Sequence, residues 1–275
     1  AGDPNEVFLG YRQGYMISHS DDNQGDFILY AKGAPLTTLS IFAYALHDDR
    51  PFEQLNRTIG WHNRVRYRSP SNYDGSPAGG PASQVHAHHF STSVDYLRGM
   101  EDGDQRWTRQ ILFLKAREAG GPDYFVFRDS FDPLGDPAET PPAELLEPKW
   151  WNLRTLGETK HLKISKDRIR YTSPYGPWLN VYFLEPDSIQ TKVEHASYSG
   201  ELYYQAALNW RKAGSPVVPT KKEDDLSGNL SDVKDEMTVT AVGPIAPGQD
   251  ILVILYPLKP GEADLNFLQL AEGVV

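Results

Sequence analysis

The sequence predicts an all-β protein, a large antiparallel β-sandwich with few helices. Short runs in which apolar and polar residues alternate recur along the chain, and few segments repeat their apolar residues at the helical period of about 3.6. Turn-forming residues separate these runs, and the chain of 275 residues contains 23 Gly and 21 Pro. The length suffices for one large core, so we interpret residues 1–275 as a single domain.

The expected strands are distributed over most of the chain. They cover residues 27–30, 36–44, 62–68, 84–97, 106–115, 123–129, 149–154, 161–165, 168–172, 178–184, 237–242 and 250–257. Two hairpins are expected, one turning over Ala119-Gly120-Gly121-Pro122 and one over Lys166-Asp167. Polar, Pro-rich or Gly-rich stretches predict loops near residues 69–83, 132–148 and 214–236.

The overall charge and composition exclude several classes of function. A net charge of −10 disfavours nucleic acid as a partner, because a polyanion repels an acidic surface. The absence of cysteine excludes a disulfide framework and thiolate chemistry. No apolar run approaches the length of about 18 residues that predicts a membrane span. The chain begins Ala1-Gly2-Asp3-Pro4, without Met or a signal sequence, so we expect a processed or excised piece of a longer protein.

The most informative stretch runs from Tyr15 to Asn63 and has a histidine near each end. His19 is followed by a carboxylate-rich turn and an apolar strand, whereas His62 and Asn63 open another strand. Neighbouring strands lie roughly 5 Å apart, so imidazoles at two strand ends can meet at one metal ion or one substrate. The alternative is that each histidine only satisfies a turn.

The strand that begins at His62 carries a row of cationic residues. At the strand period of two, His62, Arg64, Arg66 and Arg68 share one face. Guanidinium groups bind carboxylates and sulfates in a fork geometry, so this row suits an acidic sugar chain. An edge strand protected from aggregation by its charges explains the same pattern.

Two further histidines have the spacing of a metal-binding pair. His86 and His88 fall on one face of the expected strand 84–97, but no third ligand is identifiable nearby. They support either a metal-dependent enzyme or a polar strand with stacked histidines.

A series of short motifs resembles the C-terminal β-sandwich domain of the heparinase II/III-like polysaccharide lyases. In that family the series reads His-x-His-x-Asp-x-Gly-x-Phe, then Gly-x-Pro-Leu, Arg-Thr and His-Asn-x-Val. Here the same order is carried by His19, Gly25, Phe27, Leu29, Tyr30, Lys32, Gly33, Pro35, Leu36, Arg57, Thr58, His62, Asn63 and Val65. The resemblance implies a many-stranded supersandwich that is normally preceded by a helical toroid domain. Residues 1–275 contain no such helical domain, so we expect it upstream in the same gene product.

The resemblance also implies a reaction, which is β-elimination in a uronate-containing acidic polysaccharide such as a glycosaminoglycan or alginate. This reaction requires a neutralised carboxylate, a base and an acid. By resemblance, His19 takes part in proton transfer, and Tyr44 is the nearest phenol to serve beside it. Arg57, Arg64, Arg66 and Asn63 are the candidate substrate-binding residues. The same resemblance implies a secreted or periplasmic protein whose sandwich alone is inactive or weakly active.

Family members hold a structural zinc at positions that are only partly kept here. His62 falls on one metal position, and Asp21 replaces a histidine at another. The third position falls at Leu39, which has no ligand atom. Two remaining candidate ligands are fewer than a zinc site usually has, so the sequence argues against a bound zinc.

The replaced metal positions favour a second interpretation, a non-catalytic carbohydrate-binding or scaffold domain that keeps the lyase fold. Retention of His19 favours the lyase. Five tryptophans can serve as sugar-stacking faces or as core residues, namely Trp61, Trp107, Trp150, Trp151 and Trp178.

Overall fold

We analysed a computed structural model of the chain. It describes residues 6–14, 24–37, 62–66, 83–102, 105–116, 121–133, 149–156, 159–187, 189–199, 234–246 and 248–264. Within these ranges the chain is built from β-strands and one short 3₁₀ helix, Thr159–His161. None of the described helical structure is long and apolar enough to cross a membrane.

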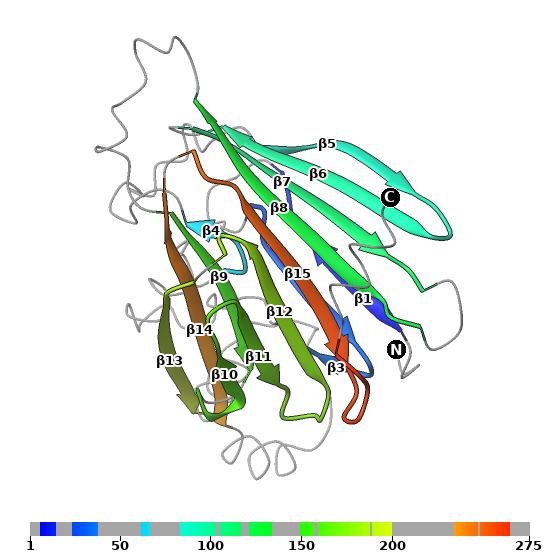
Figure 1. The fold of residues 1–275 in the computed structure, drawn as a ribbon, viewed down its shortest axis with the longest axis vertical. Helices are drawn as coiled ribbons and strands as arrows, with labels where there is room; N and C mark the ends of the chain where they lie inside the picture. The colour runs from blue at the N-terminus through cyan, green and yellow to red at the C-terminus, as the bar shows by residue number, and fades with distance from the viewer. Residues whose placement is uncertain are drawn as a thin grey trace, which may run out of the picture.

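The strands form three antiparallel sheets (Figure 1). The small sheet has the order β1-β2-β3 and consists of β1 (Val7–Tyr11), β2 (Phe27–Ala31) and β3 (Ala34–Pro35). The four-stranded sheet has the order β13-β14-β9-β4 and consists of β4 (Val65–Arg66), β9 (Lys149–Leu156), β13 (Thr191–Ser199) and β14 (Lys234–Ile245).

The largest sheet has eight strands in the order β10-β11-β12-β15-β8-β7-β6-β5. Its members are β5 (Ser83–Phe90), β6 (Val94–Asp102), β7 (Gln105–Leu114), β8 (Tyr124–Pro133), β10 (Leu162–Ile164), β11 (Arg168–Thr172), β12 (Trp178–Glu185) and β15 (Ile251–Leu258). β5 is therefore an edge strand, as Figure 1 shows.

One hydrophobic core joins the three sheets. Phe27 of the small sheet lies 4.8 Å from Phe127 of the large sheet, measured between ring centroids, and 6.5 Å from Trp151 of the four-stranded sheet. Trp151 in turn packs edge-on against Phe183, with centroids 5.5 Å apart. All four rings are almost completely buried. Because residues of every sheet contribute to a single core, the prediction of an all-β sandwich is confirmed.

Both expected hairpins are present. β7 pairs with β8 from Gln105 opposite Pro133 to Leu114 opposite Tyr124, the two strands that flank the expected turn. β10 pairs with β11 across Lys166 and Asp167. Turn-forming residues between two apolar runs were thus sufficient to predict a hairpin.

The prediction of one long strand over residues 84–97 is wrong. The chain turns at Ser91 and returns as β6, so that Phe90 lies opposite Asp95. The Ser91 hydroxyl donates to the Val94 carbonyl oxygen and accepts from the Val94 amide, and the Ser91 amide donates to the Asp95 carboxylate. These side-chain bonds make the turn without Gly or Pro, which is why alternation alone missed it.

Other strand predictions differ in extent. The strand expected over 62–68 is described only as the two-residue β4, and β1 and β13 were not predicted at all. The expected strand over 36–44 lies almost wholly outside the described residues, as does most of the loop over 214–236.

A bulge alters the His86–His88 spacing. The register of β5 against β6 shifts between Val85 and Ala87, so His86 is the extra residue of a β-bulge. The period of two that would place His86 and His88 on one face is interrupted between them. His88 instead packs on Phe90, with ring centroids 5.5 Å apart.

The first residue of β9, Lys149, is a cation inside the sandwich. Only 2% of it is exposed, and its Nζ lies 4.0 Å from the centroid of the Phe131 ring, a cation–π contact. Burial lowers the pKa of Lys149 to about 8, and the negative charge of Asp250 opposes this shift. The folded state therefore holds the Lys149 proton less tightly than the unfolded chain does.

We predict that this lysine makes stability depend on pH. Below pH 8 Lys149 is charged in both states, whereas between about pH 8 and 10 only the unfolded chain keeps the proton. The free energy of unfolding of the wild type should therefore rise from about pH 8 to pH 10. In Lys149→Met this increase should be absent. Urea titrations of both proteins at pH 7, 8, 9 and 10 measure the difference, and parallel pH profiles would contradict it.

Candidate functional site

A buried polar network lies where the three sheets meet. Its side chains are completely or almost completely excluded from solvent, although most of them carry charge. The members are Asp26, His62, Asn63, Arg64, Glu101, Arg109 and Asp129. We call this set the buried polar network.

The His62–Asn63 motif is held by Asp26, the residue directly before β2. His62 Nδ1 lies 2.9 Å from Asp26 Oδ2. Asp26 Oδ1 accepts the Asn63 amide at 2.8 Å and the Phe27 amide at 2.7 Å. The Asn63 side chain donates to the Phe27 carbonyl oxygen and accepts the amide of Arg154 in β9. The motif therefore joins the small sheet to the four-stranded sheet.

Arg109 of β7, a member of the network, donates hydrogen bonds to four oxygens. Its Nε and Nη2 donate to the two oxygens of Asp129, directly opposite on β8, at 2.7 and 2.9 Å. Its Nη1 donates to the carbonyl oxygens of Gly25 and Asn63, at 2.7 and 2.9 Å. This fork geometry requires a guanidinium, because an ammonium cannot reach four oxygens in these directions.

A second arginine enters the network from the chain just before β4. Arg64 Nη2 donates to both oxygens of Glu101 in β6, at 3.1 and 3.0 Å. The guanidinium carbons of Arg64 and Arg109 lie 4.9 and 5.0 Å from the centroid of the Trp107 ring. The Trp107 indole also donates to Asp129 at 2.9 Å. Two buried cations thus share one aromatic ring and face two buried carboxylates.

Gly25 is required where the network meets Trp107. Its φ of +73° is a left-handed conformation, which costs little only in glycine. A Cβ built on Gly25 would lie 2.5 Å from Trp107 Cζ3 and closer still to Cη2. The Gly25 of the sequence motif is thus fixed by backbone conformation and by packing together.

The charges of Arg109, Asp129, Glu101 and Arg64 act electrostatically on the buried phenol of Tyr11. Burial raises its pKa well above the usual value, so the hydroxyl stays protonated. It donates to Gln13 Oε1 at 2.6 Å. Tyr11 therefore acts as a hydrogen-bond donor here and does not act as a base at neutral pH.

Several predicted site residues lie outside the described residues. These are His19, Asp21, Leu39, Tyr44 and Arg57, together with Trp61. For Arg66 only the backbone is described, and it pairs with Trp150 in the sheet. Whether His19 and His62 meet in space stays a prediction.

The prediction of a cationic row on an open face is wrong for His62 and Arg64. Both are completely buried: His62 bonds Asp26, and Arg64 is in contact with Glu101 and Trp107 of the eight-stranded sheet. Asn63, predicted to bind substrate, is also buried, with its amide bonded to the protein. Arg64 and Asn63 thus hold sheets together in this structure.

The described donors do not complete a zinc site around His62. Zinc usually takes four ligands, and the carboxylate that meets His62 is Asp26, bonded to the ring nitrogen Nδ1. Among the described residues no three His, Cys, Asp or Glu side chains are grouped so as to hold a metal ion.

Sequence reasoning missed Asp26, Glu101, Arg109 and Asp129, although it had a usable signal for two of them. In β7, Arg109 shares its face with Trp107 and Ile111, and in β8, Asp129 shares its face with Phe127. When each strand of a hairpin has one charged residue on its apolar face, and the two residues have opposite charge and lie directly opposite each other, the pattern predicts a buried ion pair. Asp26 and Glu101 had no comparable local pattern.

Comparison with known proteins supports the fold. No protein-family model and no curated protein sequence matches the chain. Solved structures do match: heparinase III with a TM-score of 0.59 and 10% identity, and the heparan sulfate lyase HepC of Pedobacter heparinus with 0.54 and 15%. Each match covers 94% of this chain and 34% of the other.

The chain has the fold of part of heparinase III. A second heparinase III structure matches with a TM-score of 0.56 and 13% identity, over 93% of this chain and 33% of the other. The resemblance found in the sequence is therefore confirmed at the level of fold. The chain spans about one third of the length of these lyase structures.

We predict that Gly25→Ala is far more destabilising than the same change at Gly248. Both glycines have nearly the same φ, +73° and +75°, but only Gly25 is in contact with a side chain at the Cβ position. The cost of the left-handed backbone conformation is therefore about the same in both variants. The remaining difference between their losses in free energy of unfolding, about 2 kcal/mol, measures the cost of displacing the Trp107 ring. Urea unfolding followed by tryptophan fluorescence gives both values, and equal losses would contradict the packing argument.

We also predict that Arg109→Lys costs about 3–5 kcal/mol, because it leaves carbonyl and carboxylate oxygens buried without donors. Arg128→Lys is the matched control on the neighbouring strand. Arg128 also bonds a carboxylate, that of Asp250, but its side chain is 54% exposed, so a loss below about 1 kcal/mol is expected. Urea unfolding, monitored by circular dichroism, gives the loss in free energy of unfolding for each variant. Similar losses would show that burial of the network contributes little to stability.

Proposed function

We propose that this chain is the β-sandwich portion of a polysaccharide lyase that cleaves uronate-containing acidic polysaccharide by β-elimination. The observation that carries the proposal is the fold match with heparinase III and heparan sulfate lyase structures over 94% of the chain. The ordered motifs from His19 to Val65 support it independently of the coordinates.

The reaction assigns roles to residues of this chain. A base removes the proton α to the uronate carboxylate, and an acid protonates the oxygen of the departing 4-linked sugar. His19 and Tyr44 are proposed for these proton transfers. Arg57 and Arg66 are proposed to neutralise the carboxylate, which lowers the free energy of the carbanion-like transition state.

The buried polar network has a positioning role in this proposal. Asp26 and Asn63 fix the turn that leads into β4, so the backbone of Arg66 is held against β9. Arg64 stabilises the same turn through Glu101. A substrate-facing arginine at residue 66 would therefore project from a rigid support, which limits the cost of ordering it.

Full activity is proposed to require a further part of the gene product. The chain corresponds to about one third of the matched lyases, and an upstream helical domain is the proposed second wall of the substrate cleft. A secreted or periplasmic location is proposed with it, since polysaccharides of this class are extracellular.

A second candidate function is a non-catalytic carbohydrate-binding or scaffold domain that keeps the lyase fold. Asp21 and Leu39 at two of the family's metal positions favour it, together with the burial of Arg64 and Asn63. In that case the chain would bind acidic polysaccharide without cleaving it.

The test is an absorbance assay for unsaturated uronate products, with heparan sulfate and alginate as substrates and the full-length gene product as enzyme. We expect product formation, and a loss of about 10²–10⁴-fold in His19→Ala, the range for a general acid or base. His89→Ala, at an exposed histidine on β5, is the matched control and should keep full activity. Binding of either polymer without any product would contradict the lyase proposal and support the non-catalytic carbohydrate-binding domain.

A further inference from the structure

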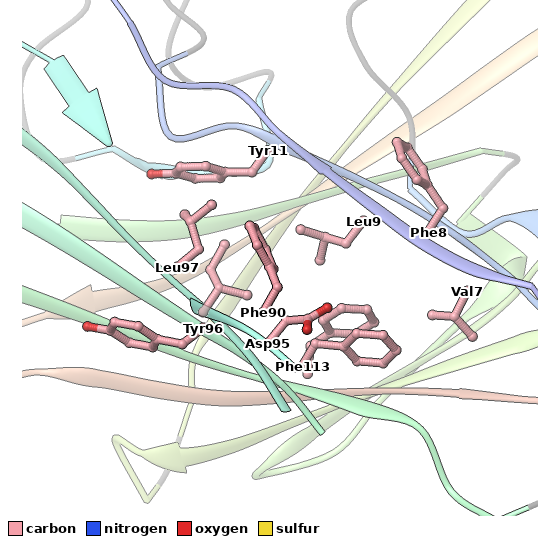
Figure 2. A pocket seen from close by; sticks show the side chains of 11 residues that line it. Val7, Phe8, Leu9, Tyr11, Phe90, Asp95, Tyr96, Leu97 and Phe113 are labelled. Carbon is pink, nitrogen blue, oxygen red and sulfur yellow. The ribbon is translucent and has the colours of Figure 1, made fainter. Parts of the chain in front are cut away.

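A half-open cavity lies between β1 and the β5 edge of the eight-stranded sheet (Figure 2). Its volume is about 320 Å³, which is within the range of small-molecule sites. Four of its lining residues turn aromatic side chains toward it, namely Tyr11, Phe90, Phe113 and Phe125, and Phe8 and Tyr96 also contribute to the lining. None of these residues takes part in the chemistry proposed above.

The cavity combines a fixed floor with an exposed rim. Phe113 and Phe125 stack at a centroid distance of 4.4 Å and an interplanar angle of 14°, which fixes both rings. At the rim, Phe90 is 65% exposed and Phe8 is 51% exposed. Exposed aromatic rings beside a preformed cavity are typical of a surface that binds a ligand.

One carboxylate, that of Asp95, points into this aromatic cavity (Figure 2). Its Oδ1 accepts Lys115 Nζ at 2.7 Å and the Ser91 amide at 3.2 Å. Within the described part of the chain, no side chain or backbone group donates to Oδ2. The cavity therefore offers apolar walls and one hydrogen-bond acceptor.

These features select the chemistry of the ligand. A wholly apolar molecule would remove water from Asp95 Oδ2 and offer no donor in return. The lining residues include no cation that could bind a uronate or sulfate, and the nearby Lys115 already bonds Asp95. A cation would compete with Lys115, which already neutralises Asp95. A neutral ring with apolar faces and hydroxyl donors satisfies every condition.

We propose that this cavity binds a neutral pyranose ring, whose C–H face stacks on Phe90 while a hydroxyl donates to Asp95 Oδ2. None of the lining residues is assigned a role in the proposed acidic-polysaccharide chemistry, and the inference does not depend on that function. It would let the sandwich hold an uncharged sugar, either a unit of a mixed polymer or a neighbouring glycan.

The experiment uses saturation-transfer difference NMR on this chain, with methyl β-glucopyranoside as the neutral probe and glucuronic acid as its charged match. Transfer to the ring C–H protons of the glucoside is expected, with weaker transfer to glucuronic acid. Phe90→Ala should weaken glucoside binding about tenfold, the loss of one stacking contact. Phe90→Trp should restore it, because the stacking face is retained.

Val85→Ala is the matched control, because Val85 is an exposed apolar residue of the same strand that does not line the cavity. It should leave glucoside binding unchanged. Binding that is equal in wild type and Phe90→Ala would overturn the proposal, as would binding of p-cresol without any binding of the glucoside. These readouts do not use polysaccharide cleavage, so an inactive lyase would leave them unaffected.

Discussion

One guanidinium group, that of Arg109, connects all three sheets of this protein. It bonds Asp129 within the eight-stranded sheet, the Gly25 carbonyl oxygen at the entrance to β2, and the Asn63 carbonyl oxygen at the entrance to β4. Hydrophobic burial brings the sheets together but does not fix their relative position, because apolar contact is non-directional. The directional bonds of Arg109 supply that specification.

The fold was largely predictable because its strongest signals are local. The hairpins over residues 119–122 and 166–167 and the strands β2, β9, β12 and β15 follow from alternation and turn residues. The β5–β6 turn was missed because it depends on the side chain of Ser91. The strand predicted from residue 62 begins only at Val65, because residues 62–64 form a bend. Local pattern cannot reveal which face of a strand another sheet will cover.

The candidate site was less predictable, for the same reason. The sequence singled out His62 and Asn63, but it could not show that both are completely buried. Arg64 was interpreted as a ligand for an acidic sugar because a guanidinium binds carboxylates, and in the structure it does bind one, that of Glu101. The prediction that Arg64 binds a carboxylate was therefore correct, but that carboxylate belongs to the protein itself. Only a long-range contact, 37 residues along the chain, distinguishes the two cases.

The motif residues that suggested the family therefore specify architecture first. Gly25 is fixed by Trp107, Phe27 by the core, and Asn63 by bonds to the segments at β2 and β9. Each position demands one residue type for a steric or hydrogen-bonding reason. Such residues identify the sandwich whatever its activity. Under the proposed function, catalysis would depend on a different set of residues, and His19 is the member of the motif series that we propose for it.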